Sequence, residues 1–350
     1  MKNITPLFYF KDHIKIVDQR KLPLELKYAY CRNEQDIFSA IKKMKIRGAP
    51  AIGVAAAFGL YLGIKDFNSK DRNDFIKRME KVIRYLSSSR PTAVNLRWAL
   101  EEVKQEVLAN RGLKIDKLKG LIYNKAVKIM RDDQDRCRRM AGFAFGLIKK
   151  GDSCLTICNA GGMATSGYGT ALGVFFKAKE RGRKFEVFAC ETRPLLQGAR
   201  ITAWELKQKG IKTTLICDSM AASLMKKGVI KKVFVGADRV TMNGDFANKI
   251  GTYSIAALAK LHKIPFYVVA PLSTFDKKLH SGRDIPIEFR NKDEITKLYF
   301  KKSIAPSGIG VFNPAFDVTD AKLVTAFITE KGIIKPPYAK NIRKIINGRK

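Results

Sequence analysis

Histidine is scarce in this sequence, and cysteine pairs are missing. The 350 residues include three histidines, at positions 13, 262 and 280, and neither an HExxH nor a CxxC motif. We therefore expect no metal site and assign no cofactor. The six cysteines, at positions 31, 137, 154, 158, 190 and 217, show no paired spacing. We expect them to be reduced and to form no disulfides.

Long apolar runs are also missing. The longest, Ala49 to Ile64, has 16 residues, fewer than the roughly 20 that span a bilayer. Charges interrupt the first 20 residues throughout, so no secretory signal is visible. We expect a cytoplasmic protein without a membrane partner.

Acidic residues are few beside the basic ones. The 32 Asp and Glu residues stand against 67 Lys and Arg, which gives a formal net charge of +35. Such an excess fits a nucleic-acid partner, or a lysine-rich surface that attracts small anions. The lysines are spread along the whole chain, and no RNP-like segment or zinc finger is present. We therefore expect an anionic small-molecule substrate and no nucleic acid.

The rhythm of apolar residues changes along the chain. After an extended segment at 14–17, apolar residues recur at helical spacing, which predicts helices over 33–45, 50–64, 71–86, 92–109 and 115–130. Farther on, β-branched apolar runs predict buried strands over 153–158, 185–190, 213–217, 232–237 and 265–270, with helix-like segments between them. The expected fold class is α/β: a mostly helical N-terminal domain (1–120, with a short β segment) followed by a Rossmann-like parallel-sheet domain (121–350).

Polar residues follow most of the predicted strands. Ligands bind beyond the carboxyl ends of the strands in open α/β sheets, so these residues mark the expected site. They are Cys158-Asn159, Glu191-Thr192-Arg193, Asp218-Ser219 and Asp238-Arg239; the last strand instead ends in Ala270-Pro271.

Two glycine-containing motifs bear on phosphate binding. The run from Gly167 to Gly173 reads GxGxxxG, which is not the dinucleotide spacing, and no GxxxxGK[ST] loop is present. Arg47-Gly48-Ala49-Pro50 and Arg90-Pro91 each precede a predicted helix, where free N–H groups beside an arginine suit a phosphate. Ordinary helix capping explains the same residues, and both interpretations stay open.

Cys158 and Asp238 each allow two interpretations. A cysteine after a buried strand is often a small core residue, but a nearby helix start lowers a thiol pKa and favours a reactive role. Asp238 after an apolar strand suits a general acid with a raised pKa, or a carboxylate paired with Arg239 or Lys249. The residues alone do not decide between these alternatives.

Seven segments together resemble one enzyme family. They are residues 46–63 (IRGAPAIGVAAAFGLYLG), 89–101 (SRPTAVNLRWALE), 156–174, 191–206 (ETRPLLQGARITAWEL), 235–260 (VGADRVTMNGDFANKIGTYSIAALAK), 265–276 and 313–319 (NPAFDVT). They are similar, in the same order, to segments of the S-methyl-5-thioribose-1-phosphate isomerase family. That family belongs to methionine salvage and shares its fold with regulatory subunits of a translation-initiation exchange factor and with ribose-1,5-bisphosphate isomerase.

The resemblance implies an activity and a set of site residues. The reaction would convert 5-methylthioribose 1-phosphate to 5-methylthioribulose 1-phosphate by acid-assisted ring opening and transfer of a hydrogen from C2 to C1, without a cofactor. Asp238 would be the proton donor and Cys158 the second catalytic residue. The substrate-binding residues would be Arg47, Gly48, Ala49, Arg90, Gln197, Asn248 and Lys249. The family also implies a homodimer formed through the α/β domain.

The chain departs from the family pattern at Ile157, where relatives often carry histidine. Two alternatives to the implied activity follow. An apolar pocket separates a methyl from a methylthio group by only a few kcal/mol, so a 5-deoxyribose-1-phosphate isomerase is the first. A non-catalytic regulatory protein of the initiation-factor type is the second.

Overall fold

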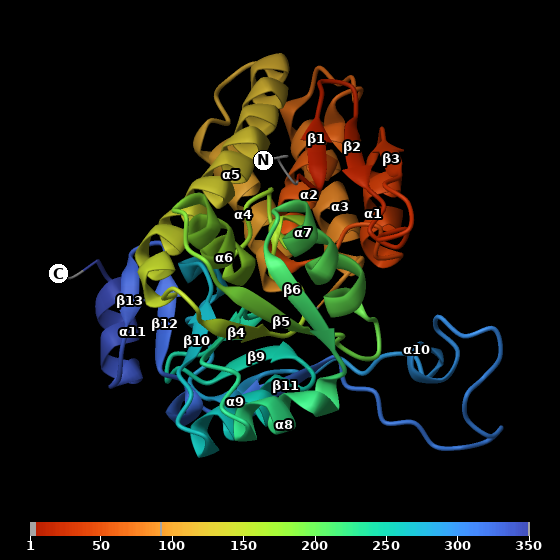
Figure 1. Cartoon of the computed structure of the whole chain (residues 1–350). Helices are drawn as coiled ribbons and strands as arrows, with labels where there is room; N and C mark the ends of the chain where they lie inside the picture. Colours follow the sequence, from red (N-terminus) through yellow and green to blue (C-terminus); the bar gives the residue numbers. More distant parts are fainter. Residues whose placement is uncertain (1–4, 92, 349–350) are drawn as a thin grey trace. The chain divides into compact units, whose positions relative to one another are not determined.

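The computed structural model describes residues 5–91 and 93–348. Contacts divide these residues into two compact units (Figure 1). The helical unit holds the described residues up to Cys137 together with Gly161–Gly169, and the sheet unit holds Arg138–Ala160 and the chain from Thr170 onward. The domain boundary expected near residue 120 falls within a helix, Ile115–Ala144. As a statement about independently folding domains, it stays a prediction.

The helical unit contains a small antiparallel sheet and a set of helices. Its elements are β1 (Leu7–Tyr9), β2 (Ile14–Val17), β3 (Tyr28–Cys31), α1 (Glu34–Lys42), α2 (Ala49–Ile64), α3 (Arg72–Ser88), α4 (Val94–Ala109) and α5 (Ile115–Ala144), whose last turns belong to the sheet unit. The expected helices are all present. Position 92, the first residue of the helix expected at 92–109, lies outside the described residues.

Helix α2 forms the centre of this unit. It is apolar on every face, and 13 of its 16 residues are buried, which is the pattern of a helix surrounded by others. Pro50 lies in its first turn, where a missing N–H costs nothing. A Cβ at Gly53 would lie 2.8 Å from the carbonyl oxygen of Asn95, so glycine allows α4 to pack directly against α2.

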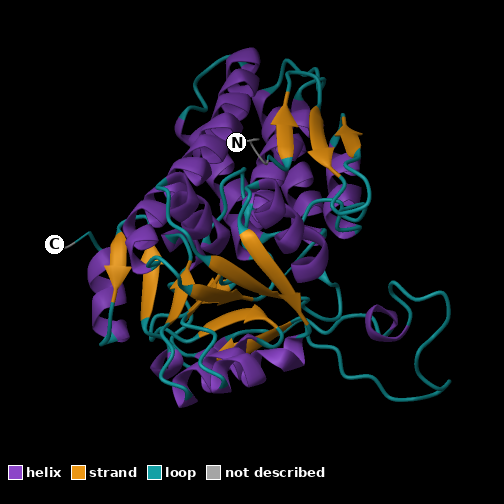
Figure 2. Ribbon diagram, in the orientation of Figure 1, coloured by secondary structure: helices purple, strands orange, loops and turns teal. Residues whose placement is uncertain are grey.

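The sheet unit is built on seven strands in the order β13-β12-β10-β7-β4-β5-β6 (Figure 2). All neighbours are parallel except β12 and β13. The strands are β4 (Ser153–Thr156), β5 (Glu186–Cys190), β6 (Lys212–Ile216), β7 (Lys232–Val235), β10 (Phe266–Val269), β12 (Ala326–Thr329) and β13 (Gly332–Ile334). Each of the five runs in the sequence forms one of the parallel strands, which confirms the predicted fold class. The prediction that all five are buried was wrong for β6, which lies at the edge of the sheet and is mostly exposed.

Helices and a second sheet complete this unit. The helices are α6 (Ala171–Glu180), α7 (Ala203–Gln208), α8 (Ala221–Lys226), α9 (Thr252–Leu261), α10 (Asp293–Thr296) and α11 (Tyr338–Ile346). The second sheet is antiparallel and contains β8 (Arg239–Val240), β9 (Phe246–Lys249) and β11 (Phe316–Thr319) in the order β11-β9-β8. Within the described part of the chain, no helix combines the length and apolar character needed to cross a membrane.

Candidate active site

The strand order of the large sheet reverses at one place. From β4 the chain adds β5 and β6 on one side, and β7, β10 and β12 on the other, so β4 and β7 are neighbours. Ligands of open α/β sheets bind beyond the strand ends at such a switch point. Cys158 follows β4 and Asp238 follows β7. The two residues predicted to be catalytic therefore lie after the two strands that flank the switch point.

The register of β4 and β7 brings their following loops together. The ladder pairs Leu155 with Val233, so the segments that follow β4 and β7 leave the sheet at neighbouring positions. A Cβ at Gly236 would lie 2.9 Å from the Cβ of Ala160. A side chain at position 236 would therefore push the two loops apart, and glycine permits their close approach.

Cys158 has an unusual backbone conformation. Its φ is +68°, in the left-handed region, which costs a residue with a side chain about 1 to 2 kcal/mol. Thr192, after β5, also has a φ of +68°, and Leu196 has +51°. Backbone strain of this kind clusters at functional sites, where surrounding contacts hold it in place. The strand ends therefore carry the geometry expected of a site.

The thiol of Cys158 differs in environment from those of its neighbours. Cys154, in β4, and Cys190, at the end of β5, are fully buried, whereas Cys158 is partly exposed. Burial raises the pKa of the Cys154 thiol to about 12 and also raises that of Cys190, so both stay protonated and inert. Of these three cysteines, Cys158 is the one that is partly exposed.

Gln197 contacts Cys158 directly. Its Nε2 donates a hydrogen bond to Sγ at 3.4 Å, and its side chain is only 2 % exposed. Its Oε1 is buried and has no partner among the described residues. A buried carbonyl without a donor costs about 1 to 3 kcal/mol. An amide that donates to the thiol and keeps an acceptor open is suited to receiving a hydroxyl group beside the sulfur.

Asp238 lies between the two sheets. Its backbone N–H donates to the carbonyl of Ala247, in β9, at 2.9 Å, and its side chain is partly exposed. Arg239 forms an ion pair with Asp276 at 3.2 Å, and Lys249 donates to the carbonyl of Ala315 at 2.5 Å. These contacts leave both interpretations of Asp238, a general acid and a paired carboxylate, open.

Asn248 and Lys249 lie in β9 and are buried, with 4 % and 8 % of their surface exposed. Asn248 donates to the hydroxyl of Thr252 at 3.0 Å, and Lys249 lies over the ring of Phe316 at 4.7 Å. Asp317 is the cross-strand partner of Asn248. A buried amide and a buried ammonium group thus lie side by side in the sequence of β9, and the start of α9 and the loop before β11 hold them in place.

Asp317 was not singled out from the sequence. Its carboxylate accepts hydrogen bonds from the N–H of Gly251 at 2.7 Å and of Tyr253 at 3.2 Å, at the N-terminus of α9. Burial raises its pKa from 3.8 to about 6, although these N–H groups and Lys249 act in the opposite direction. Asp317 therefore joins β11 to the helix that follows the predicted ligands in β9.

Arg47, Gly48, Ala49 and Arg90 lie in the helical unit. Gly48 is the N-cap of α2, with a φ of +92°, and no side chain caps this helix start. A Cβ at Gly48 would lie 2.5 Å from Cα of Ala164, so only glycine fits there. Arg90 lies shortly before α4 and is partly exposed. Each arginine thus precedes a helix N-terminus, as the sequence predicted.

Sequence reasoning missed several residues that hold Cys158 and its neighbours. These are Thr202 and Glu205, together with the structural role of Thr192. Thr202 and Glu205 lie in the same resembling segment as Gln197. Their complete burial could not be read from a helical pattern of mixed polarity.

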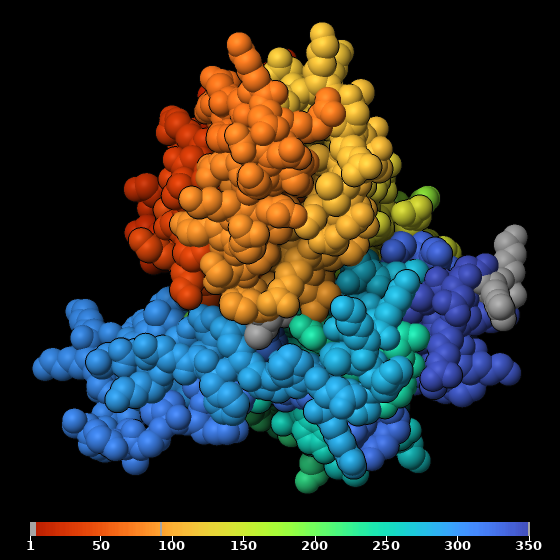
Figure 3. All heavy atoms as spheres, turned by 180° about the vertical axis from the view of Figure 1, so that it is seen from behind, coloured from red at the N-terminus to blue at the C-terminus, as the bar shows by residue number. Residues whose placement is uncertain are grey.

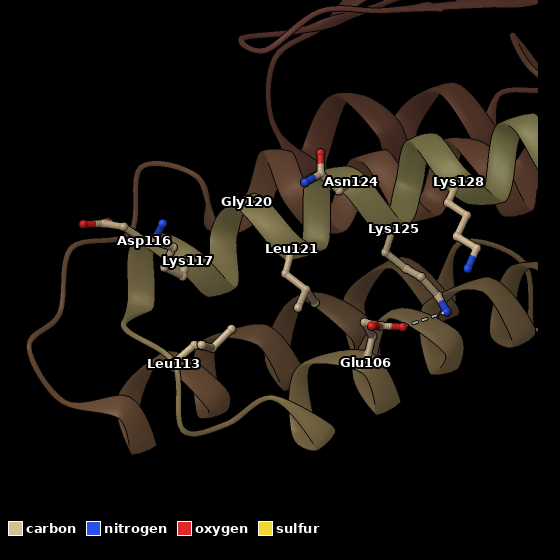
Figure 4. A pocket seen from close by; sticks show the side chains of 9 residues that line it. All are labelled: Glu106, Leu113, Asp116, Lys117, Gly120, Leu121, Asn124, Lys125 and Lys128. Atoms are coloured by element: carbon tan, nitrogen blue, oxygen red, sulfur yellow. Dashed lines mark hydrogen bonds and ion pairs between the residues drawn. The ribbon is translucent and has the colours of Figure 1, made fainter.

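A cavity of about 420 Å³ lies in the helical unit between α4 and α5 (Figure 4). Its lining residues are Glu106, Leu113, Asp116, Lys117, Gly120, Leu121, Asn124, Lys125 and Lys128. No predicted site residue lines it, and Lys125 pairs with Glu102 and Glu106 at its wall. Across the ranges that the structure describes, no three His, Cys, Asp or Glu side chains are grouped as metal ligands would be.

The fold is that of an α/β protein with a topological switch point, and the candidate site residues Cys158 and Asp238 follow the two strands that flank it. The sequence profile of the Initiation factor 2 subunit family matches residues 45–336. The chain therefore belongs to that family. Curated relatives that are similar to it over nearly its whole length are named isomerases.

Two curated relatives are similar over nearly the whole chain. A 5-deoxyribose 1-phosphate isomerase from Moorella thermoacetica is 50 % identical and covers 99 % of this chain and 98 % of its own. A methylthioribose-1-phosphate isomerase from Thermosipho africanus is 52 % identical and covers 95 % and 96 %. The two relatives are named for different sugars, and their sequence identities to this chain are too similar to favour either sugar.

Two solved structures are also similar. The 5-methylthioribose 1-phosphate isomerase of Pyrococcus horikoshii OT3 has a TM-score of 0.91 at 41 % identity, covering 99 % of this chain and 97 % of its own. The structure of translation initiation factor eIF-2B, subunit delta, from A. fulgidus has a TM-score of 0.87 at 43 % identity, covering 98 % and 99 %.

Proposed function

We propose that this chain converts 5-methylthioribose 1-phosphate to 5-methylthioribulose 1-phosphate, in methionine salvage. Relatives named for this substrate support the proposal at about half identity over nearly full length. The observation that carries it is the placement of Cys158 and Asp238 after the two strands that flank the switch point, with the amide of Gln197 on the thiol. An acid and a hydrogen carrier on neighbouring strand ends are what this isomerisation requires.

The substrate explains why two groups are needed. Its anomeric oxygen is esterified to phosphate, so the sugar cannot open to a free aldehyde by itself. We assign Asp238 the protonation of the ring oxygen, which breaks the C1–O bond of the ring. The hydrogen on C2 then moves to C1 by one of two routes, and the C2 hydroxyl loses its proton as the ketone forms, which replaces the proton taken up by the ring oxygen. Cys158 carries it as a proton through a phosphoenolate-like intermediate, or Cys158 stabilises the charge during a hydride shift.

Deuterated solvent distinguishes the two routes. Proton transfer by Cys158 allows exchange with solvent, so ketose formed in D₂O would contain deuterium at C1. A hydride shift moves the C2 hydrogen directly, so the product would contain none. Mass spectrometry of the product after a single turnover measures this.

We assign substrate binding to the residues that the resemblance implies. Arg47, Gly48, Ala49 and Arg90 bind anionic oxygens, which suits arginines beside two helix N-termini. Gln197, Asn248 and Lys249 bind the sugar hydroxyls and the developing oxyanion. The open Oε1 of Gln197 supports this assignment, because a substrate hydroxyl would supply the donor that it lacks.

A second candidate substrate is 5-deoxyribose 1-phosphate. The relative from Moorella thermoacetica supports it at 50 % identity over 99 % of the chain. The test is kcat/KM measured on both sugar phosphates with the same enzyme preparation. A higher kcat/KM on the methylthio sugar supports the preferred substrate, and an equal or higher value on the deoxy sugar overturns it.

We also propose a cytoplasmic homodimer formed through the sheet unit. Residues 286–312, here called the arm, extend beyond the rest of that unit (Figures 1 and 3). The arm exposes large apolar side chains, Phe289 at 64 % and Phe312 at 77 % among them. Arg193 donates to the carbonyl of Ile295, in the short helix α10 of the arm, at 2.8 Å. Such side chains favour contact with a second copy.

A further inference from the structure

Both backbone polar groups of Cys158 are held by threonine side chains from other elements. Its N–H donates to Oγ1 of Thr192 at 2.9 Å, and its carbonyl accepts from Oγ1 of Thr202 at 2.6 Å. Thr192 follows β5, and Thr202 ends the helical turn at Gly198–Thr202. The left-handed conformation of Cys158 is therefore fixed from both sides by residues that are distant in sequence.

Each threonine hydroxyl has its hydrogen and one lone pair committed. Oγ1 of Thr192 donates to the carbonyl of Cys190 at 3.0 Å, besides accepting from Cys158. Oγ1 of Thr202 accepts from Nδ2 of Asn159 at 3.1 Å, besides donating to Cys158. Both side chains are 0 % exposed, so water cannot replace these bonds. Neither hydroxyl can turn away without leaving a buried polar group unpaired.

A second layer of contacts fixes the two threonines. The carboxylate of Asp218 accepts from the N–H of Thr192 at 2.8 Å and of Arg193 at 2.7 Å. A Cβ at Gly198 would lie 1.7 Å from the carbonyl oxygen of Cys190 and 2.6 Å from Oγ1 of Thr192. The Gly198–Thr202 turn is thus packed directly against the end of β5. This contact places Gln197, one residue earlier, on the sulfur.

We propose that Thr192 and Thr202 are positioning residues that hold Cys158 in its left-handed conformation with Sγ at the amide of Gln197. This inference rests on the proposed function for its meaning in catalysis, but the geometry can be tested without substrate. The N–H group of Gln197 donates to Sγ, and the left-handed backbone of Cys158 directs Sγ to that donor. Loss of either hydroxyl frees Cys158 to relax to ordinary dihedral angles.

The test is alkylation of the intact protein by iodoacetamide at pH 8, with peptide mass mapping of each cysteine. Cys217 is exposed and serves as an internal reference in the same sample. In Thr202→Val, which keeps the shape and removes the hydroxyl, the ratio of Cys158 to Cys217 alkylation rates falls about threefold or more. Thr202→Ser, which restores the hydroxyl, returns the ratio toward the wild-type value.

Thr329→Val is the matched control. Thr329 is also 0 % exposed, and its hydroxyl also donates to a carbonyl, of Gly332, and accepts from an N–H, of Lys331. It lies in β12, three strands from β4. This variant lowers stability without changing the alkylation ratio. An unchanged or raised ratio in Thr202→Val, or an equal fall in Thr329→Val, overturns the proposal.

Two further measurements make the outcome decisive. If circular dichroism shows that Thr202→Val does not fold, amide hydrogen exchange of the wild-type chain tests the proposal instead. Fragmentation mass spectrometry measures this exchange residue by residue. The Cys158 N–H exchanges as slowly as the amides of β4, and exchange as fast as in the arm overturns the proposal. With active enzyme, Thr202→Val lowers kcat about tenfold and leaves KM nearly unchanged. An alkylation change without any isomerase activity keeps the positioning role and rejects the proposed function.

Discussion

Helix α2 and the ends of β4 and β5 follow local sequence rules to very different degrees. In α2, apolar residues are buried and proline occupies the first turn. At the strand ends, Cys158 and Thr192 adopt left-handed conformations without being glycine, and Gln197 buries an oxygen without a partner. Such departures cost stability, and the surrounding hydrogen bonds hold them in place. The comparison indicates that α2 is built for packing and the strand ends for chemistry.

The largest expected effect comes from replacing two cysteines, Cys154 in β4 and Cys158 in the loop that follows it. Cys158→Ala lowers kcat about 100- to 10,000-fold, because it removes the proposed hydrogen carrier, and it leaves stability unchanged or slightly raised. Cys154→Ala keeps activity and lowers the free energy of unfolding by about 1 kcal/mol, because its thiol is a buried packing group. Steady-state kinetics and urea unfolding measure both. Full activity in Cys158→Ala would remove its assigned role.

The core of the helical unit gives the next largest effect. Phe58 in α2 is 0 % exposed and stacks on Tyr9 with ring centroids 5.3 Å apart. Phe58→Ala lowers the free energy of unfolding by about 3 to 5 kcal/mol through the cavity that it leaves. Phe8→Ala, at a ring that is 40 % exposed, is the control and costs far less. Equal urea midpoints for the two variants would contradict the central role of α2.

Asp317 sharpens the comparison through pH. Its pKa of about 6 lies above the ordinary 3.8, so between about pH 4 and 6 the folded chain holds a proton that the unfolded chain has lost. The contribution of Asp317 to the free energy of unfolding is therefore greatest below pH 4. It falls as pH rises through 6, by about 3 kcal/mol in total. Asp317→Asn cannot ionise and lacks this loss.

The measurement for Asp317 is the difference in urea midpoint between Asp317→Asn and wild type, from pH 4 to pH 7. The difference shifts in favour of the variant as pH rises. Asp320→Asn, at a half-exposed carboxyl in the following turn, is the control and shows a smaller shift. If the difference in urea midpoint does not change with pH, the raised pKa of the buried Asp317 carboxyl is contradicted.

The smallest expected effect concerns the arm. Phe289 and Phe312 contact each other edge-to-face with centroids 5.4 Å apart, and both are exposed. Phe312→Ser weakens the proposed dimer by about 1 to 2 kcal/mol and leaves the unfolding of the monomer unchanged. Light scattering across a dilution series measures this. A wild-type chain that is monomeric at all concentrations would reject the dimer.

Much of the fold was predictable because four of the five predicted parallel strands, β4, β5, β7 and β10, are buried apolar runs, and helix α2 is apolar throughout. The fifth, β6, lies at the edge of the sheet and is mostly exposed. The short strands β1, β3, β8, β9, β11, β12 and β13 were not predicted, because runs of two to four residues are too short to show a period. Helix α5 extends to Ala144 rather than stopping near 130, because the charged run after Met130 hides the buried side of its later turns.

The candidate site was predictable in position and not in detail. Strand ends located Cys158 and Asp238, and the resemblance supplied Gln197, Asn248 and Lys249. Cys158 adopts a left-handed backbone conformation although it is not a glycine, so its residue type did not predict this conformation. Its threonine partners come from segments 34 and 44 residues away, so local sequence could not reveal them.

The central claim is that this chain is a sugar-phosphate isomerase whose acid is Asp238. The most direct measurement is ketose formation from 5-methylthioribose 1-phosphate and from 5-deoxyribose 1-phosphate. Wild type and Asp238→Asn are compared at equal concentrations of folded protein. The account predicts turnover by wild type, with the methylthio sugar preferred, and a loss of at least about 100-fold in Asp238→Asn. No ketose from either sugar with wild type, or full activity in Asp238→Asn, would contradict it.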